Sequence, residues 1–152
     1  MQEMRSDRAF NQSYPALASS VPRARTALAL FAQATGATPE QVEAVRLAVS
    51  EALTNAVLHG SGAGGGAIHV SASRNGLELW VRIADNGPTG DGADQPPGLG
   101  MGLGLIAYMT DYFAMSKRTE GGTEIRMCFS THAWRQTDRP RSLRPLGRPL
   151  AA

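Results

Sequence analysis

Hydrophobic side chains recur every three or four residues in two stretches of the N-terminal half, and this spacing is typical of amphipathic helices. The first stretch predicts a helix over residues 20–35, which ends before Gly36. The second predicts a long helix over residues 39–60, whose start is marked by Thr38 and Gln41. These two residues have the spacing of a capping box, in which each side chain bonds the other residue's backbone N–H. Two consecutive helices are therefore expected before the main strands.

Strict alternation of hydrophobic and polar residues replaces this pattern after the second helix. Residues 68–73 and 77–83 both alternate, and Asn75-Gly76 between them is a turn sequence. This predicts a β-hairpin with one buried face. Nearer the N-terminus, the short apolar segment 14–17 is expected to form an edge strand or a docking segment.

The C-terminal third begins with turn-forming residues, which predict a mobile loop over residues 88–99. A glycine-rich segment, residues 100–104, then runs into a third amphipathic helix over residues 105–115. A last strand is expected over residues 123–129. The element order α-α-β-β-loop-α-β-β predicts an α/β fold, a two-layer sandwich with helices on one face of a mixed β-sheet.

The second helix carries three polar side chains spaced four residues apart, Glu51, Asn55 and His59, which places them on one helix face. A carboxylate, a carboxamide and an imidazole on one face are groups that hold a metal ion, a phosphate or an activated proton. The simpler interpretation is a solvated helix face with chance polar residues. His59 has a second simple interpretation as a cap of the helix C-terminus, where positive charge is favoured.

Asp85 and Gly87 follow the second strand of the hairpin and are suited to recognising a flat base. A carboxylate at a strand end can accept a hydrogen bond from an exocyclic amine, such as that of adenine. Glycine lets the backbone approach the ring closely. The alternative for Asp85 is an aspartate that only caps a turn.

Three glycines, Gly100, Gly102 and Gly104, are expected at the N-terminus of the third helix, where free N–H groups and the helix dipole favour phosphate. The carboxamide oxygen of Asn55 is a suitable ligand for Mg²⁺, which also binds phosphate oxygens. A lone glycine motif is weak evidence. A helical ExxxN, then DxGP and then GxGxG, in this order, together predict a site for a nucleotide with Mg²⁺.

The composition fits one globular domain, because 152 residues can bury a core and the chain is 42% hydrophobic and 18% charged. No apolar run approaches the roughly 18 residues of a membrane span, and the N-terminus lacks the apolar core of a signal peptide. Cys128 is the single cysteine and cannot form an internal disulfide, which agrees with a reducing compartment. A cytoplasmic protein without a membrane partner is therefore expected.

Positive charge is concentrated in residues 132–152, which contain five arginines and one aspartate. This segment has a net charge of +4 within a chain of +2, so the remainder is close to −2. Its proline and arginine content predicts a disordered tail, and a solvated appendage is favoured over direct contact with nucleic acid. The expected organisation is a flexible N-terminus over residues 1–13, a folded domain over residues 14–131 and this tail.

Four segments of the chain resemble the motifs of the GHKL ATPases, which have the Bergerat ATP-binding fold. These segments are EALTNAVLHG, ADNGP, GLGMGLGLI and GGTEI, and they correspond to the N, G1, G2 and final-strand motifs. Within that superfamily, the small size and the N-terminal SVPRARTALALF resemble the anti-sigma-factor serine/threonine kinases. The resemblance covers about residues 14–130.

At the base end of the site, the resemblance implies that Asp85 reads the adenine amine and that Gly87 lines the base pocket. It also implies that Thr123 supports the adenine site. The alternative for Thr123 is a residue that is simply well suited to a strand.

At the phosphate end, the resemblance implies that Asn55 binds Mg²⁺, that Glu51 is the general base and that His59 faces the phosphates. The residues implied to lie against the phosphates are Gly100, Met101, Gly102 and Gly104.

The same resemblance implies ATP and Mg²⁺ as cofactors and transfer of the γ-phosphoryl group to a serine or threonine of a protein partner. That partner would be a STAS-type anti-sigma factor antagonist. The kinase, as a homodimer, would alternately hold this antagonist or a sigma factor.

One feature favours a different function. No lysine or arginine lies between Arg82 and Lys117, whereas the family's kinases often have an arginine before the glycine motif. The alternative is a non-catalytic, ATP-gated module that binds a protein partner. The catalytic half of a histidine kinase is a weaker alternative, because the first helix contains no phosphoacceptor histidine.

Overall fold

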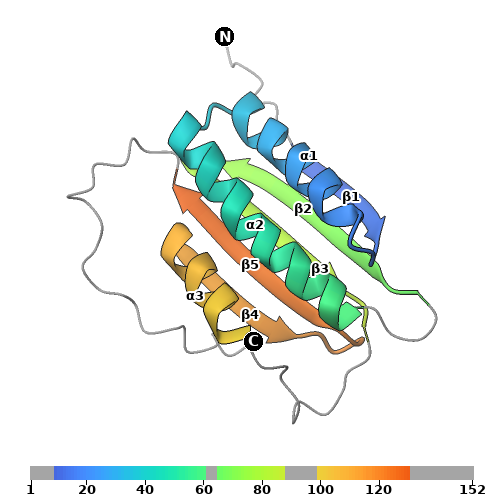
Figure 1. The fold of residues 1–152 in the computed structure, drawn as a ribbon. Coiled ribbons are helices and arrows are strands. Elements are labelled where there is room, and N and C mark those ends of the chain that lie inside the picture. Colours follow the sequence, from blue (N-terminus) through green and yellow to red (C-terminus); the bar gives the residue numbers. More distant parts are fainter. Residues whose placement is uncertain (1–8, 61–64, 88–98, 131–152) are drawn as a thin grey trace.

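The computed structural model describes residues 9–60, 65–87 and 99–130, which form a layer of helices on one sheet (Figure 1). Its helices are α1 (Ser20–Ala34), α2 (Pro39–Gly60) and α3 (Leu99–Met109). Its strands are β1 (Ala9–Pro15), β2 (Ala67–Asn75), β3 (Glu78–Asp85), β4 (Tyr112–Lys117) and β5 (Thr123–Ser130). Within the described ranges, no helix is both long and apolar enough to cross a membrane.

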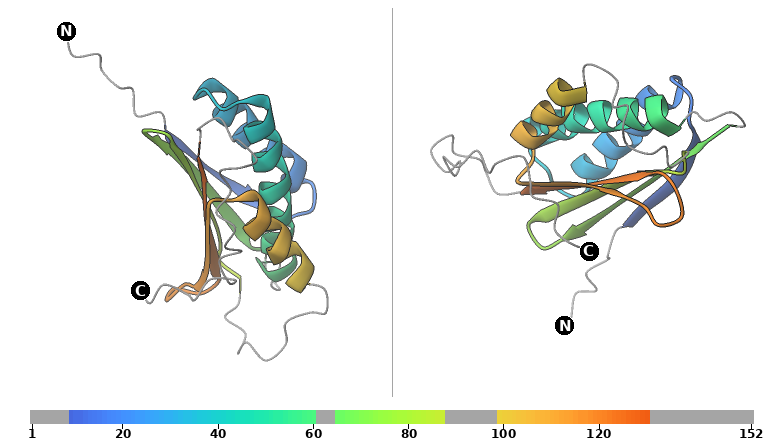
Figure 2. Two further views of the ribbon diagram at one scale, coloured as in Figure 1. Left: turned by 90° about the vertical axis from the view of Figure 1, so that its left-hand side faces the viewer. Right: turned by 90° about the horizontal axis from the view of Figure 1, so that it is seen from below.

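The described strands form a five-stranded sheet in the order β1-β2-β3-β5-β4, and the helices cover one face of it (Figure 2). This confirms the two-layer α/β sandwich. Each neighbouring pair of strands is antiparallel, so the expected mixed sheet is wrong. The reason is that α3 leads into β4 at the outer edge. The chain then turns back, and β5 inserts beside β3 in the opposite direction.

Helix α2 lies at the centre of the helical layer and packs on β2, β3 and β5. The hydrophobic stripe expected on this helix is buried against alternate residues of the strands. On α2 the buried residues are Val45, Ala48, Val49, Ala52, Leu53 and Ala56, and on the strands they include Ile68, Val70, Leu79, Val81, Ile83, Ile125 and Met127. The core therefore fixes which face of α2 remains for polar chemistry.

The predicted capping box is present at the start of α2. The N–H of Thr38 donates to Oε1 of Gln41 at 2.7 Å, and the N–H of Gln41 donates to Oγ1 of Thr38 at 3.2 Å. Nε2 of Gln41 also donates to the backbone oxygen of Ser130 at 2.6 Å. The cap therefore ties the start of α2 to the end of β5, in addition to stabilising the helix.

The hairpin of β2 and β3 is confirmed, but its turn lies one residue later than expected. Asn75 pairs with Glu78, so Gly76 and Leu77 form the turn. Gly76 has a φ of 60°, which glycine adopts without strain. Leu77, expected on the buried face, is 47% exposed in this turn.

The third helix spans Leu99–Met109 instead of residues 105–115, so it begins and ends earlier than expected, and the chain then enters β4. The backbone N–H of Asp111 donates to the oxygen of Cys128 at 2.9 Å, which begins the pairing with β5. Phe113, expected on the helix, instead pairs with Met127 in the sheet. Cross-strand pairing outweighs the local helical pattern here.

Strand β1 is an edge strand, but of the expected segment 14–17 only Tyr14 and Pro15 belong to it, and it begins at Ala9, within the segment expected to be flexible. The ring of Phe10 lies 5.9 Å from that of Phe31 on α1, and Tyr14 is buried in the core. Two aromatic side chains on one face of the strand therefore anchor it beneath α1.

The face of the sheet away from the helices carries a charge network between β3 and β5. Oε1 of Glu124 accepts hydrogen bonds from Nε of Arg82 and of Arg126, each at 2.6 Å. Burial alone would raise the pKa of Glu124, but the two guanidinium groups outweigh it and hold the pKa below its ordinary value. Nearby, burial and two carboxylates raise the pKa of Cys128 to about 12, so this thiol stays protonated and unreactive at neutral pH.

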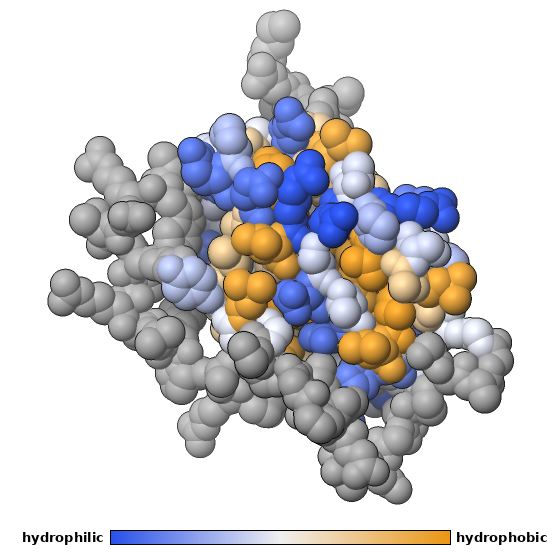
Figure 3. Space-filling model, in the orientation of Figure 1, coloured by the Kyte–Doolittle hydropathy of each residue, from blue (hydrophilic) through white to orange (hydrophobic). Residues whose placement is uncertain are grey.

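The outer side of the helical layer mixes polar and hydrophobic side chains (Figure 3). It includes exposed leucines, namely Leu30 on α1 and Leu47 and Leu58 on α2. These residues are not needed for the core, and Leu47 and Leu58 lie on the helix that also carries Glu51, Asn55 and His59.

Candidate functional site

The C-terminal ends of α2 and β3 and the N-terminal ends of α3 and β5 lie at the same end of the molecule (Figure 1). Helix α2 contacts both α3 and β3. Four segments that are separate in the sequence therefore bring their candidate residues toward one end of the fold.

Glu51 and Asn55 lie on the side of α2 that faces α3. A side-chain carbon at Gly102 would lie 2.9 Å from Oε2 of Glu51 and 3.9 Å from Nδ2 of Asn55. Glycine at this position therefore leaves room for both polar groups. The polar face of α2 is directed at the glycine segment of α3 rather than spread over a solvated surface.

The amide nitrogen of Asn55 is buried and has no hydrogen-bond partner among the described residues. A buried donor left unpaired costs about 1–3 kcal/mol, and such groups in native proteins point to a ligand, an ion or water. His59, one turn further on the same face, is half-buried in the last turn of α2. That position suits a phosphate contact and a helix cap equally, so its role stays a prediction.

Asp85 is the buried carboxylate of the site, with 4% of its surface exposed at the end of β3. Its Oδ1 accepts hydrogen bonds from the backbone N–H of Gly87 at 3.0 Å and of Thr123 at 3.3 Å. The bond to Gly87 is the turn-capping contact weighed as the alternative. Among the described residues, both hydrogen bonds to this carboxylate end on Oδ1, and Oδ2 accepts none.

Gly122 forms one wall beside Asp85. A side-chain carbon at Gly122 would overlap the backbone oxygen of Asp85 and lie 2.8 Å from its Oδ1. Gly122 also has a φ of 90°, and Gly121 before it has a φ of 105°. From the sequence these glycines were assigned to a turn and to the final-strand motif GGTEI, but their contact with Asp85 was not predicted because it joins distant segments. The pair of glycines directly before a strand is the available signal.

Arg118 is a second residue that the sequence did not reveal. Its Nη1 donates to the backbone oxygen of Asp85 at 2.9 Å, and its backbone N–H donates to the oxygen of Gly122 at 2.9 Å. Arg118 therefore braces the end of β3 against the β4–β5 turn. Thr123 also reaches Asp85 through its backbone, so its contact there does not depend on its side chain.

The glycine motif lies in the first two turns of α3, which begins at Leu99. A side-chain carbon at Gly104 would meet no atom within 4 Å, so the fold alone does not require glycine there. The side chain of Met101 lies outside the described residues. So do most of the predicted loop over residues 88–99 and the whole of the tail over residues 132–152.

Comparison with known proteins places this geometry in context. The sequence profile of a family described as the histidine kinase-like ATPase domain matches residues 14–129. An anti-sigma F factor of Bacillus licheniformis is 29% identical over 130 residues, covering 78% of this chain and 89% of that protein. An anti-sigma F factor of Clostridium kluyveri is 32% identical over 115 residues, which cover 68% of this chain and 81% of that protein.

Two further matches are partial. An anti-sigma F factor of Clostridium acetobutylicum is 39% identical over 64 residues, which span 42% of this chain and only 45% of that protein. The crystal structure of the RsbU and RsbW domains of Rv1364c from Mycobacterium tuberculosis superposes with a TM-score of 0.66 at 20% identity. That match covers 81% of this chain and 32% of the solved chain, and it shows a shared fold.

Proposed function

The chain belongs to the histidine kinase-like ATPase domain family, and from this premise we propose that it is an ATP-binding anti-sigma factor with serine/threonine kinase activity. The observation that carries the proposal is the environment of Asp85. A buried carboxylate has one oxygen held by two backbone N–H groups, while the other accepts no hydrogen bond from the described residues. Gly122 lies so close to Asp85 that no side chain fits at position 122. Such a carboxylate suits one directional hydrogen bond, as from the adenine amine.

The donor set on α2 fits Mg²⁺. This ion prefers oxygen ligands, keeps several waters and also binds substrate phosphates, so the amide oxygen of Asn55 can serve as its protein ligand. Asn55 would hold it through Oδ1, and the buried, unpartnered Nδ2 of the same amide supports a hydrogen-bond acceptor, such as a phosphate oxygen, at this point. When bound there with ATP, the ion would neutralise charge on the phosphate oxygens.

In the proposed reaction, Glu51 accepts the proton of the attacking serine or threonine hydroxyl. The hydroxyl oxygen forms a bond to the γ-phosphorus of ATP as the bond to the bridging oxygen breaks, and ADP leaves with that electron pair. The N-terminus of α3, with Gly102 and Gly104, would cradle the phosphates. The proposed acceptor is a STAS-type antagonist, and the antagonist and a sigma factor would bind alternately to a homodimer. Exposed leucines on α1 and α2 suit such contacts.

A non-catalytic, ATP-gated binding module is the second candidate. No lysine or arginine lies between Arg82 and Lys117, and the nearby Arg118 is engaged at the backbone of Asp85, the base end of the site. Incubation of the full chain with γ-labelled ATP and candidate STAS proteins separates the two functions. A labelled antagonist supports the kinase, whereas nucleotide binding without label supports the module.

Asn55→Ala is expected to weaken nucleotide binding in the presence of Mg²⁺ by at least roughly tenfold, because the ion loses its protein ligand. Titration of a fluorescent ATP analogue with Mg²⁺ and with EDTA measures the effect. Thr54→Ala is the matched control, since Thr54 is an exposed neighbour whose Oγ1 donates a hydrogen bond to the backbone oxygen of Ser50 at 2.7 Å. Unchanged Mg²⁺-dependent affinity in Asn55→Ala would remove this residue from the metal site.

Gly104→Ala is expected to have opposite effects on stability and on ATP binding. The added methyl group meets no atom within 4 Å, and alanine favours a helix interior over glycine by up to about 1 kcal/mol. The free energy of unfolding without ligand should therefore rise, while ATP affinity falls because the methyl group occupies the phosphate position. Denaturant unfolding and ATP titration measure the two effects. Equal ATP affinity in both proteins would place the phosphates elsewhere.

A further inference from the structure

A cavity of about 200 Å³ lies at the opposite end of the helical layer from the candidate nucleotide site. It is formed by the start of α2, the end of α3 and the end of β5. Its lining residues are Glu40, Gln41, Ala44, Met109, Asp111, Phe129 and Ser130. None of these residues was assigned to the nucleotide site, so the cavity requires a separate explanation.

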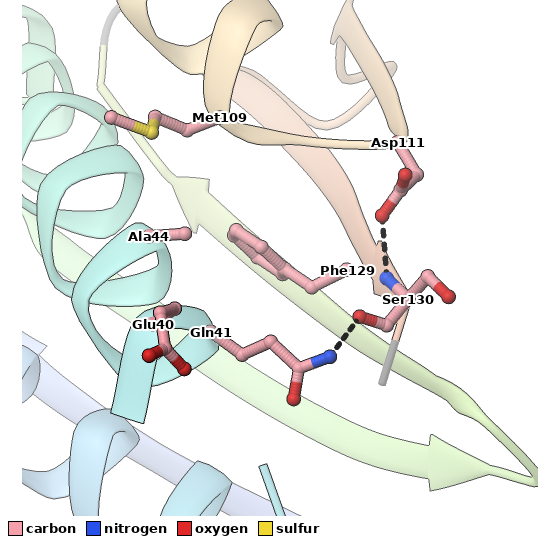
Figure 4. Close-up of a pocket in the computed structure, with 7 residues that line it drawn as sticks. All are labelled: Glu40, Gln41, Ala44, Met109, Asp111, Phe129 and Ser130. Carbon is pink, nitrogen blue, oxygen red and sulfur yellow. Dashed lines mark hydrogen bonds between the residues drawn. The ribbon is translucent and has the colours of Figure 1, made fainter. Parts of the chain in front are cut away.

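The cavity combines an apolar interior with acidic groups. Figure 4 shows the side chains of Met109 and Phe129 directed toward Ala44, while Asp111 reaches Ser130 from the other side. Oδ2 of Asp111 accepts a hydrogen bond from the N–H of Ser130 at 2.5 Å. Glu40 also lines the cavity, and no lining residue is basic. An occupant should therefore carry a large apolar group next to positive charge.

The chain itself supplies such a segment directly after the cavity. Ser130 both lines the cavity and precedes the C-terminal segment, whose sequence continues THAWRQTDRPR. Trp134 follows Ser130 by four residues, so its Cα lies within roughly 14 Å of that of Ser130. Arg135 follows Trp134 directly, and Arg139 lies five residues after it. The segment as a whole has a net charge of +4, opposite to that of the remaining chain.

We propose that the C-terminal segment folds back and places the indole of Trp134 in this cavity, with its arginines beside Glu40 and Asp111. A cavity of about 150 Å³ holds a benzene ring, so the volume here suits an aromatic side chain. A short covalent connection gives an effective concentration in the millimolar range, which favours this segment over a separate basic peptide. The proposal is independent of the proposed kinase function.

The test uses the full chain with Trp80→Phe, which leaves Trp134 as the only tryptophan. Acrylamide quenching of Trp134 should be several-fold weaker than that of a synthetic peptide of residues 131–152. Ala44→Phe, which fills the cavity, should raise quenching to the peptide value. Leu47→Phe is the matched control, because Leu47 is exposed on the same helix and does not line the cavity. Circular dichroism verifies the fold of each variant.

The charge component is tested by Glu40→Gln, which should increase the quenching of Trp134 at low salt. Glu43→Gln is its control, since Glu43 does not line the cavity and its Oε1 lies 3.4 Å from Nε of Arg46. Quenching of Trp134 equal to that of the free peptide, or unchanged by Ala44→Phe, would overturn the proposal. Protection that is lost on dilution would place the segment of a second copy in the cavity and would also overturn it.

Discussion

Asp85→Asn is expected to weaken ATP binding by roughly 100-fold or more, the largest effect on affinity of any single change proposed for this protein. Asparagine retains Oδ1, so the hydrogen bonds from the N–H groups of Gly87 and Thr123 persist. The other oxygen becomes an NH₂ group, which would face the adenine amine donor to donor. ATP would therefore lose its partner while the end of β3 keeps its shape.

The same substitution predicts a change in base preference. ITP carries a carbonyl oxygen where ATP carries the amine, and this oxygen can accept a hydrogen bond from the new NH₂ group. The ratio of ITP to ATP affinity should rise, as measured by calorimetric titration with each nucleotide. Asp111→Asn is the control, because it makes the same chemical change at the opposite end of the fold. Unchanged ATP affinity in Asp85→Asn would refute base recognition by this carboxylate.

If Asp85→Asn lost affinity for both ATP and ITP and also lost stability, Asp85 would act only within the turn. The free energy of unfolding without ligand separates this outcome, and it should change by less than about 1 kcal/mol. The test therefore distinguishes a base-reading carboxylate from the turn-capping aspartate that the contact with Gly87 also shows.

Local patterns were sufficient to predict the elements that depend on local contacts. The capping box of Thr38 and Gln41 is a short-range exchange of hydrogen bonds and was visible from its spacing. The buried stripe of α2 follows from a helical period that continues over many residues. The polar ladder of Glu51 and Asn55 follows from the same period, and these residues face α3 as its consequence.

Features that depend on pairing between distant segments were not predictable in this way. Residues 112–115 continue the predicted helical pattern, but Met127 and its neighbours in β5 offer a strand partner that stabilises β4 instead. The antiparallel arrangement likewise depends on β5 inserting beside β3. Gly122 and Arg118 acquire their roles only because the β4–β5 turn lies against Asp85.

The corrected elements also explain how the base end of the site is held. Since β5 rather than β4 is the neighbour of β3, Thr123 at its start is placed opposite the end of β3 and its N–H reaches Asp85. Arg118 then ties the preceding turn to the backbone of the same aspartate. Backbone groups therefore orient the carboxylate on two sides, which is the preorganisation that specific recognition of a small ligand requires.

Glu51→Gln is expected to lower the rate of phosphoryl transfer by roughly 10²–10⁴ while leaving ATP affinity nearly unchanged. The carboxylate of Glu51 faces the glycine segment of α3, where a side-chain carbon at Gly102 would lie 2.9 Å from its Oε2. Glutamine has nearly the same shape but cannot accept the hydroxyl proton of the acceptor. Single-turnover transfer to a STAS protein, together with ATP titration, measures the two effects separately.

Glu43→Gln is the matched control for this substitution, because Glu43 is an exposed carboxylate two turns earlier on the same helix. It should alter neither the transfer rate nor the ATP affinity. Equal transfer by Glu51→Gln and the unmodified chain would assign the proton to another group. Loss of ATP binding along with transfer would instead make Glu51 a part of the nucleotide site, and the separation of base reading by Asp85 from proton transfer on α2 would then be wrong.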